Sequence, residues 1–217
     1  HFLEHMVFKG TKNRNVREIA QSLESLGGYL NAFTTKEQTC FYARVLEEDL
    51  ALAVDVVCDL VGGPRLSPND VDLERRVVLE ELSSVEDNPE DLIGDLGMAQ
   101  LWPGHILGTS ILGTRESLTA LDAEHVAAFH LREYLAPRAV VSVAGAADPQ
   151  RVEALFTEHL DLPHHAGGDG RTAPSPAANT LTVYPSDLAQ VHLLLVSPAP
   201  SDRDPRRRPV SLLAEIL

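Results

Sequence analysis

Two short β-prone segments set between helix-periodic segments constrain the fold of this chain most. Residues 30–35 and 39–45 are rich in aromatic and β-branched side chains, and a polar link at Lys36-Glu37 joins them. So short a link connects strands that run antiparallel. Helical segments precede and follow this pair of strands.

Apolar residues three and four positions apart, together with capping signals, predict the helices. A short helix starts at His1 and ends near Gly10, and Asn15 with Glu18 resembles a capping box for the next helix. The other predicted helices run from Asp49 to Gly62, from Pro68 to about Asp87, through Leu101, from Leu118 to Tyr134, from Asp148 to about Leu160, and to the end of the chain.

Three further strands are predicted, at residues 139–145, 181–184 and 191–196, the first of them buried. A stretch rich in Gly, Pro and Ala precedes the last two and predicts a linker at 166–180. We therefore expect a first module at 1–165 and the start of a second module at 181–217. The sequence opens without Met and its last helix has no stop signal, so we expect a chain truncated at both ends.

The composition limits the kinds of partner that this chain is expected to bind. The formal net charge is −14, from 32 acidic and 18 basic residues, which argues against nucleic acid or an anionic membrane as a partner. No apolar run reaches the length of a membrane span. Cys40 and Cys58 lie in apolar, periodic stretches and are predicted to be reduced core residues. The sequence does not give the compartment, although a bacterial origin would favour the cytoplasm.

The strongest candidates for catalytic residues lie in the first five residues of the chain, HFLEH. At about 100° per helical residue, His5 lies roughly 40° from His1 and Glu4 about 60° the other way, so all three share one face. Two imidazoles one turn apart can both reach a zinc ion. The carboxylate between them is placed to take a proton from zinc-bound water. The order H-x-x-E-H occurs among metallopeptidases.

A catalytic zinc ion also needs a third protein ligand and an open position. The predicted helix that begins at Pro68 offers Glu74, Glu80, Glu81 and Glu86. Glu74 and Glu81 are seven residues apart and share one face, whereas Glu80 points elsewhere. Spacing alone does not decide which glutamate faces the histidines, and solvated surface charges are the ordinary alternative for each of them.

The sequence resembles the pitrilysin or insulinase-like zinc metallopeptidases, and within them the mitochondrial processing peptidase β-subunit and its bacterial relatives. The resemblance covers nearly the whole chain, weakens across the linker, and rests on HFLEHMVFKGT, LGGYLNAFTTKEQTCFYARV, ERRVVLEEL, ILGTRESL and YLAPRAVVSVAG. It implies a zinc-dependent endopeptidase that acts on unfolded segments or peptides. It also implies an α+β fold, an antiparallel sheet with helices packed on it, in homologous modules arranged in two halves around a chamber.

The resemblance assigns roles that spacing leaves open. It implies that His1, His5 and Glu81 hold one zinc ion and that Glu4 activates the attacking water. It makes Glu74 a supporting acid of the catalytic site, near the metal but not a ligand. These five residues form the predicted catalytic site, in which three hold the metal.

The same resemblance predicts how substrate binds. Asn31 and Ala32 would pair with the substrate backbone at an edge strand, and Phe33 would line a side-chain pocket. Strand addition of this kind reads main chain and tolerates varied sequence.

The alternative function is a non-catalytic binding or scaffold subunit of a processing-peptidase-like complex. Such members of the family usually lose the HxxEH residues, whereas this chain keeps them. The expected partner is a second copy in a homodimer or the second half of a longer chain. Because that half and the strand that normally precedes the HxxEH helix are not in the sequence, we expect the fragment by itself to be inactive.

Overall fold

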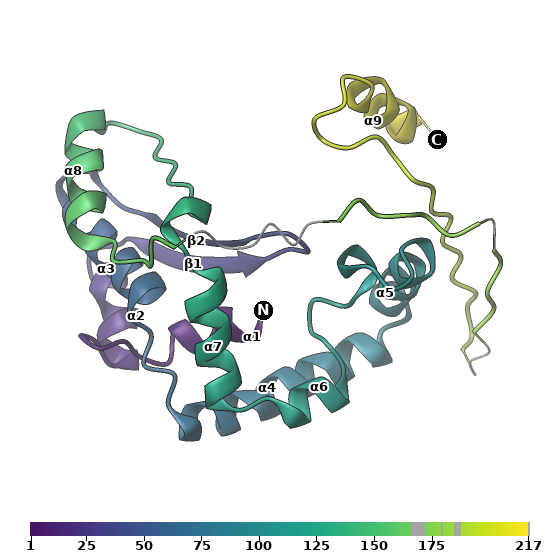
Figure 1. The fold of residues 1–217 in the computed structure, drawn as a ribbon, viewed down its shortest axis with the longest axis horizontal. Coiled ribbons are helices and arrows are strands. Elements are labelled where there is room, and N and C mark those ends of the chain that lie inside the picture. Colours follow the sequence, from purple (N-terminus) through teal and green to yellow (C-terminus); the bar gives the residue numbers. More distant parts are fainter. Residues whose placement is uncertain (166–171, 179, 185–187, 217) are drawn as a thin grey trace. The chain divides into compact units, whose positions relative to one another are not determined.

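The computed structural model describes residues 1–165, 172–178, 180–184 and 188–216 (Figure 1). These residues fall into two compact units. The first unit comprises His1–Ser83 and Ile111–Arg171, and the second comprises Ser84–Ser110 and Thr172–Leu217.

The first unit contains the predicted hairpin. Strand β1 (Tyr29–Thr34) pairs with strand β2 (Thr39–Arg44) in an antiparallel register that places Asn31 opposite Tyr42 and Thr34 opposite Thr39. The link between them closes with a hydrogen bond from the Thr35 amide to the Gln38 carbonyl at 2.8 Å. The hairpin and the helices around it confirm the predicted α+β class.

The helices that lie in the first unit, or begin in it, are α1 (Phe2–Val7), α2 (Val16–Glu24), α3 (Leu50–Gly62), α4 (Pro68–Asp87), α6 (Arg115–Ala120), α7 (Ala123–Glu133) and α8 (Pro149–His159). The capping box predicted for α2 is confirmed, since the side chains of Asn15 and Glu18 each accept a hydrogen bond from the other residue's amide. Helices α1 and α2 contact β1, while α3 contacts β2 and α8 (Figure 1).

The main core of the first unit is formed around α1. Leu3, Met6 and Val7 occupy one face of this short helix and are 5%, 0% and 0% exposed. They pack with apolar residues of α2 and α3, among them Leu23 and Val56. This buried face fixes the rotation of α1 about its axis, so the positions of His1, Glu4 and His5 on the rest of the helix follow from it.

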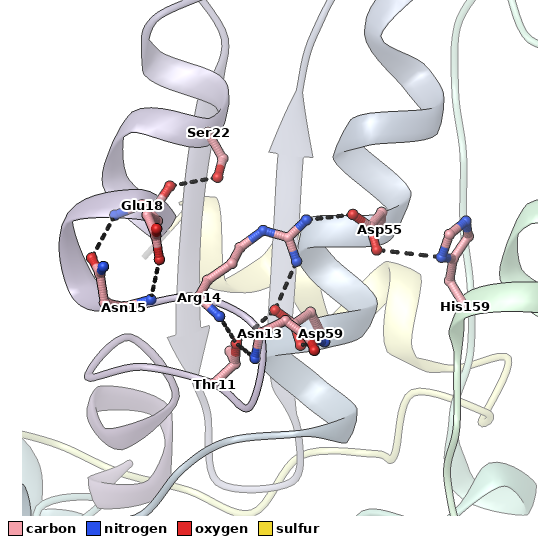
Figure 2. Close-up of polar contacts among 9 residues, drawn as sticks. All are labelled: Thr11, Asn13, Arg14, Asn15, Glu18, Ser22, Asp55, Asp59 and His159. Carbon is pink, nitrogen blue, oxygen red and sulfur yellow. Dashed lines mark hydrogen bonds and ion pairs between the residues drawn. The ribbon is translucent and has the colours of Figure 1, made fainter.

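A polar cluster anchors the loop that follows α1 (Figure 2). Asp59 on α3 is 8% exposed and accepts hydrogen bonds from Thr11 Oγ1 at 2.6 Å, Asn13 Nδ2 at 2.7 Å and Arg14 Nη1 at 2.7 Å. Arg14 also pairs with Asp55, one turn earlier on α3. The carboxylate of Asp59 therefore ties the end of α1 to α3.

We expect Asp59→Ala to lower the free energy of unfolding by about 3 kcal/mol, because the Thr11 hydroxyl and the Asn13 amide lose their acceptor and Arg14 loses one of its two carboxylate partners. Asp55→Ala on the same helix is the matched control. Its carboxylate is 36% exposed, so the expected loss is about 1 kcal/mol or less. Urea denaturation followed by circular dichroism measures both, and equal losses would contradict the assignment of Asp59 as the anchor.

One predicted helix is wrong in its extent. The segment 118–134 forms two helices, α6 and α7, rather than one. The division arises at Asp122, which has extended backbone and whose side chain accepts a hydrogen bond from the His125 amide at 2.8 Å. A new N-cap inside an apolar-periodic segment ends one helix and starts the next.

The three further predicted strands are also wrong. Residues 139–145, 181–184 and 191–196 pair with no strand within the described part of the chain. Val140 is 92% exposed and Val191 is 96% exposed, so these segments are not buried either. Composition predicted extended backbone, but a strand also needs a neighbour to accept and donate its ladder hydrogen bonds.

The second unit contains α5 (Pro89–Leu101), a 3₁₀ turn at Ile106–Gly108 and α9 (Arg207–Ile216). Asn88 caps α5 by accepting a hydrogen bond from the Glu90 amide. The predicted linker lies partly outside the described residues, and the division of the chain into modules stays a prediction. Searched over its described residues, the chain has no helix that combines the length and apolarity needed to cross a membrane.

Candidate metal centre

Helix α1 presents the two histidines side by side. His1 is its N-cap residue, and the His5 amide donates to the His1 carbonyl at 3.2 Å, so the two residues lie one turn apart. Their ring centroids are 4.6 Å apart. The side chains are 13% and 25% exposed, so both rings are partly buried.

Glu81 approaches both rings from α4. One carboxylate oxygen lies 3.7 Å from His1 Nε2 and the other lies 3.9 Å from His5 Nε2. The three donor atoms all lie within 4.8 Å of one another, and no other such group of His, Cys, Asp and Glu occurs among the described residues. Donors in a tetrahedral zinc site are about 3.3 Å apart, given bonds of about 2.0–2.1 Å. The side chains therefore fit zinc after a small closure.

Glu74, also on α4, contacts His5 at the ring nitrogen that does not face Glu81. Its side chain is 5% exposed. One carboxylate oxygen accepts a hydrogen bond from His5 Nδ1 at 2.8 Å, and the other lies 2.5 Å from Lys9 Nζ. A carboxylate at one ring nitrogen fixes the tautomer and leaves the lone pair on the other nitrogen. For His5 that other nitrogen is Nε2, which faces Glu81. Glu74 thus contacts His5 through Nδ1 and is not a member of the three-residue donor group.

His1 lacks such support. Its Nδ1 is buried, and within the described chain it has no hydrogen-bond partner. Glu80 and Glu86, which spacing left open as ligands, are not members of the donor group. Glu80 is exposed on α4.

Glu4 is held by the sheet rather than by α4. The Thr34 hydroxyl, at the end of β1, donates a hydrogen bond to Glu4 Oε2. Burial raises the pKa of Tyr134 to about 12, and the negative charge of Glu4 adds to this shift. Sequence reasoning missed Thr34, although strand alternation from Phe33 turns Thr34 toward the helices.

The predicted substrate residues lie on β1, as expected from the sequence. Because the Thr35 amide bonds Gln38, ladder alternation turns the backbone of Ala32 away from β2 and toward the free edge. The Asn31 side chain occupies this edge by accepting from the Ala32 amide at 2.9 Å. Phe33 is 44% exposed and lies 6.2 Å from the Tyr42 ring.

Two histidines and one carboxylate with a neighbouring glutamate are the ligand and base set of catalytic zinc sites in peptidases. The family described as insulinase, peptidase family M16, matches residues 1–115, and the family described as the peptidase M16 inactive domain matches residues 120–217. The chain belongs to peptidase family M16, the insulinase family, which confirms the resemblance.

Individual relatives agree with the family. The chain is 44% identical over 203 residues to an uncharacterized zinc protease of Mycobacterium leprae, which covers 90% of this chain. It is 33% identical over 196 residues to the mitochondrial-processing peptidase subunit beta of Blastocladiella emersonii, again over 90% of this chain. The matches cover 45% and 42% of those two proteins, so the chain spans less than half the length of these relatives.

Solved structures agree with the fold. A protease from Helicobacter pylori superposes with a TM-score of 0.72 at 24% identity, covering 82% of this chain and 43% of that one. Pitrilysin superposes with a TM-score of 0.69 at 22% identity, covering 80% of this chain and 19% of pitrilysin. These likenesses confirm an α+β fold of the pitrilysin type.

Proposed function

We propose that this chain carries the zinc site and the general base of a metalloendopeptidase that hydrolyses peptide bonds in unfolded segments or peptides. The observation that carries the proposal is the convergence of His1, His5 and Glu81 within 4.8 Å, with Glu4 on the same turn of α1. Membership in a family of peptidases, and the zinc proteases among its relatives, support it.

The roles of the side chains follow from their contacts. His1, His5 and Glu81 would hold zinc, which supplies Lewis acidity by lowering the pKa of a water molecule and polarising a peptide carbonyl. Glu4 would accept the proton of the attacking water and return it to the leaving amine. Glu74 keeps the His5 ring in the orientation and tautomer that present Nε2.

Substrate would bind along β1 as an added strand. The backbone of Ala32 faces the free edge, and strand addition supplies main-chain hydrogen bonds whatever the substrate sequence. Because Asn31 already bonds the Ala32 amide, substrate would have to displace that side chain. Phe33, on the outer face of the hairpin, would contact a substrate side chain.

The rest of the protein would complete the site. We propose that a second half, in the same chain or in a second copy, forms the other wall of the substrate chamber. The match of residues 120–217 to the inactive-domain family and the greater length of the relatives support this arrangement. A scaffold subunit without activity is the competing function.

Metal removal tests the proposal on the full-length protein that contains this chain. We expect one zinc per site and cleavage of a quenched-fluorescence peptide. A chelator should abolish cleavage, and added zinc should restore it. Peptide binding without cleavage by the zinc-loaded protein would instead identify a scaffold subunit. Bound zinc with neither peptide binding nor cleavage would point to a hydrolase of other substrates.

A further inference from the structure

A pair of threonine hydroxyls stands between the sheet and Glu4. Thr34 and Thr39 are the last opposed residues of β1 and β2, and their Oγ1 atoms lie 3.2 Å apart. Side chains at such cross-strand positions approach closely. Thr34 Oγ1 also bonds Glu4 Oε2, so this pair connects the hairpin directly to α1.

The direction of these hydrogen bonds is fixed by chemistry. An ionised carboxylate can only accept, so the single Thr34 hydroxyl proton goes to Glu4. Thr34 must then accept from Thr39 at their 3.2 Å contact. Two hydroxyls therefore point their protons, one after the other, toward Glu4.

Tyr134, the C-cap residue of α7, packs beside β2. Its ring lies 4.9 Å from the His130 ring and 6.2 Å from the Phe41 ring. His130 is 7% exposed, and its Nε2 lies 2.7 Å from the Val61 carbonyl. These contacts support β2 at the end of the hairpin that carries Thr39.

We propose that Thr34, backed by Thr39, is a positioning residue that fixes the carboxylate of Glu4 for proton transfer. Thr34 holds Oε2, which leaves Oε1 as the oxygen that takes the proton from water. The inference rests on the proposed peptidase function and adds to it a link from the hairpin to the base. Because the hairpin also presents the Ala32 edge, one structural element would position both the substrate and the base.

The first test is kinetic and uses the zinc-loaded full-length protein. Thr34→Val keeps the shape but removes the hydroxyl, and we expect kcat to fall roughly 10- to 100-fold, the range for a hydrogen bond to a charged group. We expect KM and zinc affinity, measured by chelator competition, to stay within about twofold because the substrate edge and the ligands are untouched. Thr34→Ser should restore kcat to within about threefold of the wild type.

The matched control is Thr35→Val. Thr35 is the next residue, and its hydroxyl bonds neighbouring residues of the turn, including the Gln38 carbonyl at 3.3 Å. We expect this variant to cleave normally. Normal kcat in Thr34→Val, or equal losses in Thr34→Val and Thr34→Ser, would overturn the proposal.

The second test does not depend on activity. A double-mutant cycle of Thr34→Val and Glu4→Ala in the metal-free protein measures their coupling in the unfolding equilibrium. We expect a coupling of about tenfold, because residues in direct contact are not additive. Additive effects would overturn the proposal. If the wild-type protein binds zinc but does not cleave, the proposed function fails, while this cycle still decides whether Thr34 holds Glu4.

Discussion

Glu4→Gln is expected to lower peptide turnover by a factor of about 10²–10⁴ while the protein keeps its zinc. The amide keeps the shape of the side chain but has no basic oxygen to accept the proton of the attacking water. Zinc should remain, because the donor group contains His1, His5 and Glu81 but not Glu4. Metal analysis and a quenched-fluorescence assay on the same full-length preparation measure the two properties.

The matched control for this variant is Glu24→Gln, an equally small change at an exposed position of α2. It should leave both turnover and zinc content unchanged. If the Glu4→Gln variant turned over substrate at a near-normal rate, another group would be the base. If it lost its zinc, Glu4 would be acting in metal binding instead.

The metal site was predictable in part from residue periodicity. One helix face for His1, Glu4 and His5 follows from their spacing, and the structure places these residues on α1 with both histidine rings beside Glu81. The choice of Glu81 over Glu80 did not follow from spacing. It depends on how α4 is rotated and where it crosses α1, which long-range packing decides.

Hydrogen bonds between segments far apart in the chain could not be predicted from the sequence. Thr34 is 30 residues from Glu4, and no local pattern indicates that the two meet. Asp59, likewise, is 48 residues from Thr11. Residues 139–145 show a related difficulty: their composition predicts a buried strand, but strand pairing depends on a neighbour that local sequence does not describe, and they pair with no described strand.

Glu81→Ala is expected to weaken zinc binding by more than about 100-fold, since even the partners behind metal ligands contribute about 10–100-fold. Removing Glu81 leaves two imidazoles, and a catalytic zinc site ordinarily needs three protein ligands. Loss of metal should abolish cleavage with it. Chelator competition on the full-length protein gives the affinity directly, apart from activity.

Two further variants on α4 make the test specific. Glu80→Ala changes the adjacent residue, whose side chain points about 100° away around the helix, and should keep normal affinity. In Glu74→Ala the zinc affinity should fall by about 10–100-fold, a loss between those of the other two variants, because His5 would lose the acceptor that orients its ring. This order of affinities, with Glu80→Ala unchanged and Glu81→Ala weakest, separates a ligand from a supporting acid and from a surface charge. Equal zinc retention by the Glu80 and Glu81 variants would show that Glu81 is not a ligand, whatever its distance from the two rings.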